Sequence, residues 1–222
     1  RSYMAKLITK NIWGPVKPED ELKTIFIYDW DDTLFPTTFL APNGCYDEKL
    51  IYQEDLEKIK MLEALIYEIL KNSIEKGSTY IVTNAAPGWV EYSCYKYFPK
   101  AKPLLNSISI ISARGDFSEI YPRDRRKWKI AAFLKIANNI NPNHTTNLIC
   151  IGDSIFEMEA AHVLASKLNH VYIKTVKMKE YPTPEDIKKQ IKLINKDFKK
   201  IVTTLDNFII KVANRMRSET FN

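Results

Sequence analysis

The chain has 222 residues, 45% of them hydrophobic and 12% aromatic, which is enough for one α/β domain with a buried core and excludes a disordered protein. It has no run of 18 apolar residues and no basic N-terminal region followed by an apolar block, so we expect a cytoplasmic protein with neither a membrane span nor a secretory signal. The net charge of +6 belongs to the last part of the chain, because from Lys174 onward 12 Lys and Arg stand against 6 Asp and Glu, while the earlier residues hold 21 of each.

The first predicted strand, Thr24 to Tyr28, is β-branched or aromatic at nearly every position, which is typical of a strand covered on both faces in a parallel sheet. It stops at three acids within four residues, Asp29, Asp31 and Asp32. Open α/β sheets place their ligand sites at the carboxyl ends of strands. Crowded carboxylates repel each other unless a cation or hydrogen-bond donors compensate. The cluster therefore indicates either a ligand site or a solvated acidic turn in which Asp32 caps a short helical turn.

The middle of the chain alternates helices and strands. The apolar spacing predicts helices over residues 54–75, 85–98, 125–140 and 155–168, and strands over residues 78–84, 107–113, 147–152 and 170–176, the last at one side of the sheet. Thr83 and Asn84 close the second strand, and Asp153 follows the fourth. This alternation predicts an α/β fold, a Rossmann-like parallel sheet with helices on both faces.

Residues 182–222 are predicted to form a long amphipathic basic helix appended to a domain of residues 1–181. Pro182-Thr183-Pro184 is a helix-start signal, and apolar residues then recur at alternating steps of four and three, namely Ile187, Ile191, Ile194, Phe198, Ile201, Leu205, Phe208 and Val212. The pattern fits a helix docked on its own domain, self-association or a connection to a further domain. Its charge fits a solvated face, or contact with an acidic partner or an anionic membrane.

Four features in the chain occur in a fixed order, each at a strand end or at the start of the adjoining helix. Asp29-Trp30-Asp31-Asp32-Thr33 matches DxDxT, Thr83 ends the apolar strand TYIVTN, a lysine opens the helix RRKWKIAAF, and Gly152-Asp153 precedes Glu157. This order resembles the haloacid dehalogenase (HAD) superfamily of magnesium-dependent phosphohydrolases and covers about residues 24–177. It resembles the phosphatase branch, which has an aspartate two positions after its nucleophile, here Asp31.

The resemblance implies a role for each residue. Asp29 would be the nucleophile that forms an aspartyl-phosphate, and Asp31 would be the general acid and then the general base. The Asp29 side chain, the Asp31 backbone carbonyl and Asp153 would hold Mg²⁺, whose preferred ligands are oxygen atoms. The Thr83 hydroxyl and the Asn84 backbone amide would bind the phosphoryl oxygens, and a lysine would stabilise the developing charge.

The lysine and the second acid of the last motif are less specific. Lys127 and Lys129 both lie near a helix start, and Lys129 is favoured because Trp128-Lys129 precedes the apolar run as in the family. Glu157 stands where the family more often has aspartate, so it would bind the metal through water, orient Asp153 or face solvent. Asp32 is interpreted as structural.

Other residues carry no decisive pattern. The three cysteines are widely spaced without a CxxC pair, which indicates a reducing compartment and argues against a structural zinc site. Trp30, Trp89 and Tyr46 indicate either core packing or the lining of a site entrance.

The resemblance also implies a substrate class. The gaps between the motifs are too short for a folded lid, as in family members that admit macromolecules, notably protein phosphatases. WDDTLFPT, VTNAAPGW, RKWKIAAF and KEYPTPEDIKKQI look like an aspartate-based phosphatase group whose bacterial members include effectors delivered into the host cytoplasm to act on phosphotyrosine. We therefore expect a phosphoprotein substrate. The alternatives are a small-metabolite or nucleic-acid 3′-end phosphatase and a non-catalytic binding module; the neutral domain argues against a nucleic-acid partner.

Overall fold

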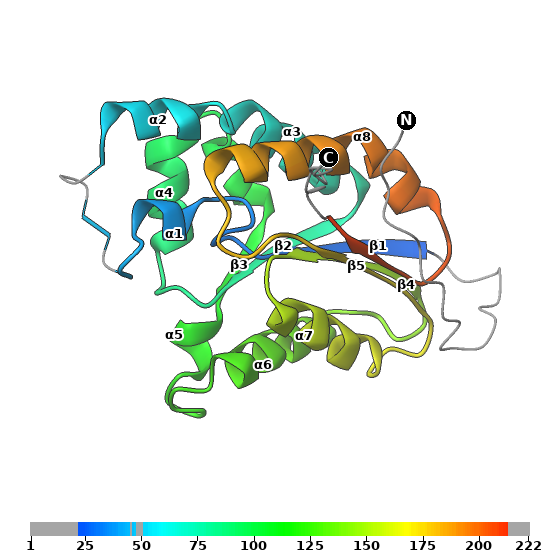
Figure 1. Ribbon diagram of the computed structural model, residues 1–222. Coiled ribbons are helices and arrows are strands. Elements are labelled where there is room, and N and C mark those ends of the chain that lie inside the picture. The colour runs from blue at the N-terminus through cyan, green and yellow to red at the C-terminus, as the bar shows by residue number, and fades with distance from the viewer. Residues whose placement is uncertain (1–21, 45, 48–50, 213–222) are drawn as a thin grey trace, which may run out of the picture.

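The computed structural model describes residues 22–44, 46–47 and 51–212, which form one α/β domain around a parallel sheet (Figure 1). The strands of this described part are β1 (Leu22–Tyr28), β2 (Ser78–Thr83), β3 (Ser109–Ser112), β4 (Thr145–Gly152), β5 (Val171–Lys177) and β6 (Phe208–Lys211). Their order is β3-β2-β1-β4-β5-β6, and every neighbouring pair is parallel. The first five strands lie within two residues of their predicted bounds.

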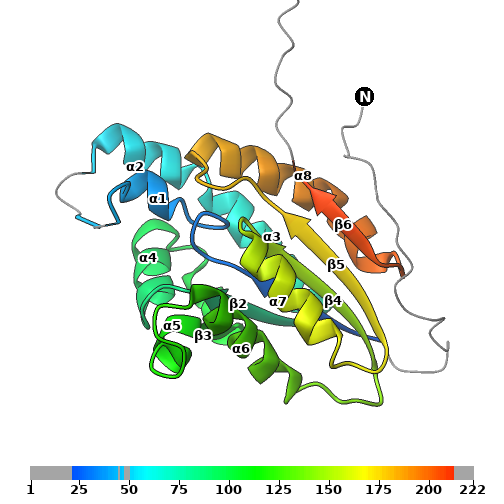
Figure 2. The same cartoon turned by 60° about the horizontal axis from the view of Figure 1, so that its bottom comes forward.

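Helices cover both faces of the sheet, as predicted (Figure 1 and Figure 2). The α-helices are α1 (Thr37–Leu40), α2 (Gln53–Lys60), α3 (Glu63–Lys76), α4 (Trp89–Tyr97), α5 (Ala113–Phe117), α6 (Arg125–Ala137), α7 (Ile155–Ala165) and α8 (Pro184–Thr203), and a 3₁₀ helix, η2, spans Lys102–Ser107. Helices α3, α4 and α8 contribute to the core on one face, and α6 and α7 contribute to the core on the other. The fold class predicted from the sequence is therefore confirmed.

Strand β1 is apolar throughout its second half because it lies between these two cores. Phe26 and Tyr28 pack on the side of α3 and α8, whereas Ile25 and Ile27 pack on the side of α6 and α7. Alternate side chains of a strand point to opposite faces, so both sets are needed to cover the sheet. The Phe26 ring stacks on Phe198 of α8 with 5.6 Å between centroids.

The strand order creates a switch point between β1 and β4. From β1 the chain proceeds to β2 and β3 on one side, and it then returns to β4 on the other side of β1. Loops leaving β1 and β4 therefore diverge at the carboxyl end of the sheet, which is where doubly wound folds bind ligands. Asp29 follows β1 and Asp153 follows β4 at this point.

The helix predicted over residues 54–75 is two helices. Helix α2 ends at Lys60 and α3 begins at Glu63, with a turn at Met61 and Leu62 between them. Leu62 is fully buried, and the turn lets α2 contact α4 while α3 contacts β2. Both helices also contact α8, and the turn between them gives each one a further neighbour of its own, which the continuous apolar period did not reveal.

The prediction of one helix over residues 182–222 is wrong in length. Helix α8 ends at Thr203, and Phe208–Lys211 forms β6, which pairs with β5 in parallel. Strand β5 is therefore an inner strand, and the prediction that it lies at one side of the sheet is also wrong. Residues 213–222 of the predicted helix lie outside the described part of the chain.

Of the alternatives for this helix, docking on its own domain is the one observed. The buried face of α8, with Ile187, Ile191, Ile194, Phe198 and Ile201, belongs to the same core as β1. The boundary predicted between residues 181 and 182 therefore divides a continuous core. Among the described residues, no helix is both long enough and apolar enough to span a bilayer.

Candidate active site

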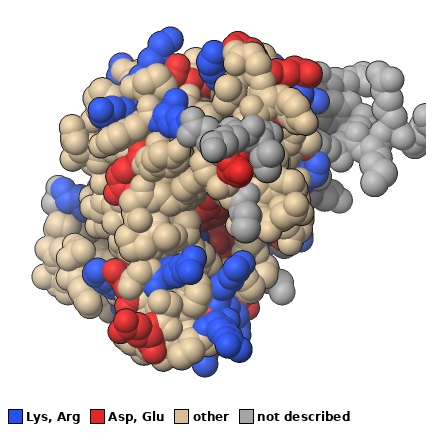
Figure 3. All heavy atoms as spheres, turned by 90° about the vertical axis from the view of Figure 1, so that its left-hand side faces the viewer, with Lys and Arg blue, Asp and Glu red and all other residues tan. Residues whose placement is uncertain are grey.

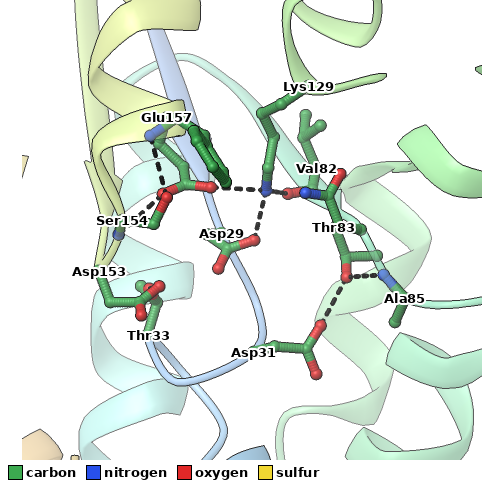
Figure 4. A network of polar contacts seen from close by, with 12 residues as sticks. Asp29, Asp31, Thr33, Val82, Thr83, Ala85, Lys129, Asp153, Ser154 and Glu157 are labelled. Atoms are coloured by element: carbon green, nitrogen blue, oxygen red, sulfur yellow. Dashed lines mark hydrogen bonds and ion pairs between the residues drawn. The ribbon is translucent and has the colours of Figure 1, made fainter. Parts of the chain in front are cut away.

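The candidate active site lies where the carboxyl ends of β1, β2 and β4 meet (Figure 4). Asp29 follows β1, Thr83 ends β2, Asp153 follows β4, and Lys129 enters from the second turn of α6. These residues come from four separate segments of the chain. The fold thus brings together most of the residues that the sequence analysis selected.

Asp29 is the buried acid at the centre of this site, with 6% of the residue exposed. Its Oδ1 accepts a hydrogen bond from Lys129 Nζ at 2.6 Å. Burial raises the pKa of Asp29 well above its ordinary value; the charge of Lys129 opposes this, while the carboxylates of Glu157, Asp153 and Asp31 add to it. The ionised form of Asp29 therefore needs more positive charge than Lys129 alone provides.

Lys129 is held by three acceptors. Its Nζ lies 2.6 Å from Asp29 Oδ1, 2.7 Å from the Val82 carbonyl oxygen and 3.1 Å from Glu157 Oε1. Burial lowers the pKa of Lys129, but the Asp29 and Glu157 carboxylates together outweigh this and hold the pKa above its ordinary value. Lys129 is therefore a buried ammonium directed at Asp29.

Lys127 does not enter the site. Two residues along an α-helix correspond to a rotation of about 200°, so Lys127 and Lys129 lie on opposite sides of α6. Lys127 is exposed and pairs with Asp124 at 3.4 Å. The favoured choice of Lys129 agrees with this geometry.

Asp31 lies apart from Lys129 and is held by three donors. Its Oδ1 accepts from Thr37 Oγ1 at 2.5 Å and from Trp89 Nε1 at 2.7 Å, and its Oδ2 accepts from Thr83 Oγ1 at 2.6 Å. The Thr83 hydroxyl in turn accepts from the Ala85 backbone N–H at 2.9 Å. These contacts fix the Asp31 carboxyl beside the end of β2, as Figure 4 shows.

Asp153 is the acid contributed by β4. Its Oδ1 accepts from Thr33 Oγ1 at 3.3 Å, and its backbone carbonyl accepts from Lys177 Nζ. Burial raises the pKa of Asp153 to about 7, and the charges of Glu157 and Asp32 contribute to the increase. Like Asp29, this carboxylate lies where positive charge would stabilise it.

Glu157 is buried, with 3% of the residue exposed, so the alternative that it faces solvent is wrong. Its Oε2 accepts from the Ser154 backbone N–H at 2.9 Å and closes the capping box of α7, while Oε1 contacts Lys129. A Cβ at Gly152 would lie 2.7 Å from Glu157 Cγ, so a glycine is needed for this close approach. Glu157 therefore positions Lys129.

The donor set fits a magnesium ion. Carboxylate oxygens of Asp29, Asp153 and Glu157 all lie within 4.8 Å of one another. Mg²⁺ prefers such hard oxygen ligands and usually retains several waters. Because both Glu157 oxygens already have partners, Asp29 and Asp153 are the two side chains of this group that could bind the ion directly. A cation between them would also offset the mutual repulsion of their carboxylates.

The Asn84 side chain contacts the backbone of α6. Its Nδ2 donates to the Arg125 carbonyl oxygen at 3.4 Å, at the start of α6. Its Oδ1 is buried and has no hydrogen-bond partner among the described residues. The contribution of the Asn84 backbone amide to phosphoryl binding stays a prediction.

Asp32 takes part in the loop structure, as predicted. Its backbone has φ = 56°, a conformation that Asp and Asn tolerate better than most residues. Its carboxylate accepts from the Thr38 backbone N–H at 2.9 Å and from the Thr38 hydroxyl.

The sequence analysis missed three polar contacts of the site: those of Thr33, Thr37 and Trp89. Thr33 is the threonine of the DxDxT motif, so that motif was the available signal. Thr37 lies six residues after Asp31 in the sequence, and Trp89 lies 58 residues after it. No spacing rule connects such positions, and only the folded chain brings them together.

An aromatic cluster adjoins Asp31. The Trp89 ring centroid lies 5.2 Å from that of Tyr46 and 5.9 Å from that of Tyr92, which is 44% exposed. Trp30, by contrast, is fully buried and donates to Ser93 Oγ at 2.9 Å. Of the aromatic residues left open by the sequence, Trp30 is therefore a core residue, while Trp89 and Tyr46 lie beside the site.

No family model, curated protein or solved structure matches this chain. The functional argument therefore rests on the residues and their geometry.

Proposed function

We propose that this protein is a magnesium-dependent phosphatase of the HAD superfamily that acts through an aspartyl-phosphate at Asp29. The observation that carries the proposal is the pair of separately held acids after β1. Asp29 is buried against the Lys129 ammonium, whereas Asp31 is bound by neutral donors beside β2. Two acids in such different surroundings suit two different roles, one as nucleophile and one as acid and base.

In the first step, an oxygen of the Asp29 carboxylate attacks the phosphorus atom, and the bond from phosphorus to the leaving oxygen breaks. Asp31 gives its proton to that leaving oxygen. In the second step, Asp31 takes a proton from water, the water oxygen attacks phosphorus, and the bond to Asp29 breaks to release inorganic phosphate. Both carboxyl groups then have their starting protonation.

Lys129 supplies fixed positive charge next to the attacking group. Its three acceptors hold the ammonium in place, so little reorganisation is needed as charge develops on the phosphoryl oxygens. A magnesium ion bound by Asp29, Asp153 and the Asp31 backbone carbonyl would supply further charge neutralisation between carboxylate and phosphate.

The surroundings of the site support a protein substrate. Between Asp29 and Thr83 the described residues form α1, α2, α3 and the strand β2, and between Thr83 and Lys129 they form α4, η2, β3, α5 and the start of α6. None of these described segments folds into a separate cap domain. The aromatic cluster beside Asp31 suits a phenyl leaving group, because aromatic side chains pack favourably on one another. Phosphotyrosine is therefore the favoured phosphoester.

Hydrolysis of p-nitrophenyl phosphate tests the class of reaction. We expect turnover with Mg²⁺, loss of turnover with a chelator, and a loss of about 10⁴-fold or more in Asp29→Asn. Asp32→Asn is the matched control, since it changes the same chemical group in the same loop at a position whose positive φ asparagine tolerates. Asp32→Asn should remain active; an Asp29→Asn variant with full activity would rule out the mechanism.

A further inference from the structure

Three arginines surround a small pocket next to the candidate active site. The pocket has a volume of about 270 Å³ and is lined by Arg114, Arg123 and Arg125 together with Asn84 and Trp128. Figure 3 shows the face onto which the carboxyl ends of the strands open, with Lys and Arg side chains gathered below a central hollow that has acidic atoms at its base. The positive charge here is local, because residues 1–173 are neutral as a whole.

Within the described part of the chain, the arginines of the pocket have no acidic partner, unlike their neighbours. Arg126 pairs with Glu159 at 2.5 Å, and Lys135 pairs with Asp116 at 2.9 Å. Among the described residues, no carboxylate lies within ion-pair distance of Arg114, Arg123 or Arg125.

The acid nearest in sequence is already engaged. Asp124 caps α6 by accepting from the Lys127 backbone N–H at 3.0 Å and pairs with the Lys127 ammonium. Three guanidinium groups around one hollow are thus left available for an anion. Arginine presents its donors in a planar fork that matches carboxylate and phosphate geometry.

Asn84 connects this pocket to the phosphoryl site. It lines the pocket, and it follows Thr83, whose hydroxyl binds Asp31. Since Asn84 Nδ2 donates to the Arg125 carbonyl, its buried Oδ1 remains an acceptor without a partner in the described part of the chain. Because Asn84 lines the pocket and directly follows Thr83, an anion in the pocket would lie next to the proposed phosphoryl site.

We propose that this arginine pocket binds a second anionic group of the phosphoprotein substrate, a carboxylate or another phosphate, close in sequence to the residue that is dephosphorylated. The inference rests on the proposed phosphatase function and names the substrate feature that the enzyme selects. An extended peptide spans about 3.3–3.6 Å per residue. Because the pocket and the phosphoryl site share the segment Thr83-Asn84, the second anion lies within a few residues of the first.

The test is a series of phosphotyrosine peptides with alanine flanks. Each carries one glutamate, or one phosphonate analogue of phosphoserine that cannot be hydrolysed, at a position within about four residues on either side. The quantity measured is kcat/KM for each peptide divided by kcat/KM for the all-alanine peptide. We expect this ratio to reach about fivefold to tenfold at the best position, mainly through KM. The two arms distinguish a carboxylate from a phosphate as the preferred group.

The pocket variant is Arg114→Gln/Arg123→Gln, which leaves Arg125 in place because its carbonyl holds Asn84 and its helix carries Lys129. The ratio should fall to near one in this variant. Arg126→Gln/Lys127→Gln is the matched control, because it removes the same amount of charge from the adjoining helix α6 at residues that do not line the pocket, and it should keep the wild-type ratio.

Three results would overturn the inference: a wild-type ratio near one at every position, a ratio that survives in the pocket variant, or a ratio lost equally in the control. Failure of the phosphatase function is a separate result, in which the wild type hydrolyses neither the peptides nor p-nitrophenyl phosphate. In that case fluorescence anisotropy with the phosphonate peptides still tests the pocket. Weaker binding in the pocket variant alone would support it, and equal binding in both variants would overturn it.

Discussion

Two buried lysines, Lys129 and Lys174, lie in contrasting parts of this fold. Lys129 is 1% exposed at the carboxyl end of the sheet and contacts the carboxylates of Asp29 and Glu157. Lys174 is fully buried between β5 and the end of α8, and its Nζ donates to the carbonyl oxygens of Ile201 at 2.7 Å and Val202 at 3.3 Å.

The surroundings give the two ammonium groups opposite behaviour. The acids raise the pKa of Lys129, whereas burial lowers the pKa of Lys174 to about 8, since only Asp206 opposes it. Lys174 anchors the last turn of α8 to the strand that pairs with β6. The same residue type thus serves charge stabilisation where acids surround it, and backbone anchoring where carbonyl groups surround it.

Replacing each lysine by methionine should give the largest difference in kcat/KM between the two sites. We expect Lys129→Met to lower kcat/KM for p-nitrophenyl phosphate by about 10²- to 10³-fold, because the fixed charge next to Asp29 is lost. Lys174→Met should change kcat/KM by less than about twofold, because the contacts of Lys174 with the carbonyl oxygens of Ile201 and Val202 and with the Phe208 ring lie outside the candidate site. Similar losses of activity in the two variants would contradict the separation of roles.

The pH dependence of the free energy of unfolding should show the contribution of the buried Lys174. Between pH 8 and the ordinary pKa of 10.5, the unfolded chain keeps a proton at Lys174 that the folded chain has lost, so stability rises with pH in this window. Below pH 8 both states are protonated, and the unfavourable contribution is constant. From pH 8 to 10.5 the free energy of unfolding of the wild type should therefore rise by about 3 kcal/mol relative to Lys174→Met. Urea unfolding at a series of pH values measures this difference; a flat difference curve would contradict it.

Magnesium should raise the stability of the protein by binding at its acid-rich end. At a concentration about 100 times its dissociation constant, Mg²⁺ should add about 2.7 kcal/mol to the free energy of unfolding, which corresponds to a rise in Tm of about 5–10 °C. Asp153→Asn should lose this rise. Glu159→Gln, which removes a half-buried acid of α7 that pairs with Arg126 and lies outside the acid cluster, should keep it. Thermal unfolding with Mg²⁺ and with chelator measures both, and an equal rise in the two variants would argue against the proposed site.

The smallest effect should come from a single donor to Asp31. Trp89→Phe keeps an aromatic ring but loses the indole N–H that donates to Asp31 Oδ1, and kcat should fall about threefold to tenfold. Trp30→Phe loses an equivalent hydrogen bond, to Ser93 in the core, and should lower stability without lowering kcat. Steady-state kinetics on both variants checks this, and an unchanged kcat in Trp89→Phe would remove Trp89 from the account of Asp31.

The sequence predicted the sheet and its acidic end because those signals are local. The run from Thr24 to Tyr28 is apolar at nearly every position, as a strand with two covered faces requires, and Asp29 follows it immediately. The choice of Lys129 over Lys127 also used a local signal, since Trp128-Lys129 directly precedes the apolar run of the helix, and the contacts of the two lysines agree with it. In each case the deciding information lies within a few residues.

The end of α8 was mispredicted because its apolar period continues past the true helix. Leu205, Phe208 and Val212 extend the pattern, yet the chain leaves the helix after Thr203 and pairs with β5. The available signal was Phe208-Ile209-Ile210, three consecutive residues that favour strands. Strand pairing with β5 and the burial of Phe208 decide the outcome, and neither is local in the sequence.

The contacts around Asp31 and Glu157 could not be predicted for a related reason. Trp89 reaches Asp31 across 58 positions of the chain, and Glu157 reaches Lys129 from a different helix. Contacts between residues so far apart in the sequence can be predicted only when the order of the strands is known. The sequence therefore predicted the positions of the acids and of Lys129 better than the contacts that hold them in place.

Trapping the intermediate tests the central claim most directly. The enzyme would be acid-quenched during turnover of a phosphotyrosine peptide, treated with borohydride and digested for mass spectrometry. Borohydride reduces an acyl phosphate, so the account predicts homoserine in place of aspartate at position 29 and unmodified Asp31, Asp32 and Asp153. Turnover that leaves Asp29 unmodified, or a modification at another residue, would contradict the assignment of Asp29 as the nucleophile.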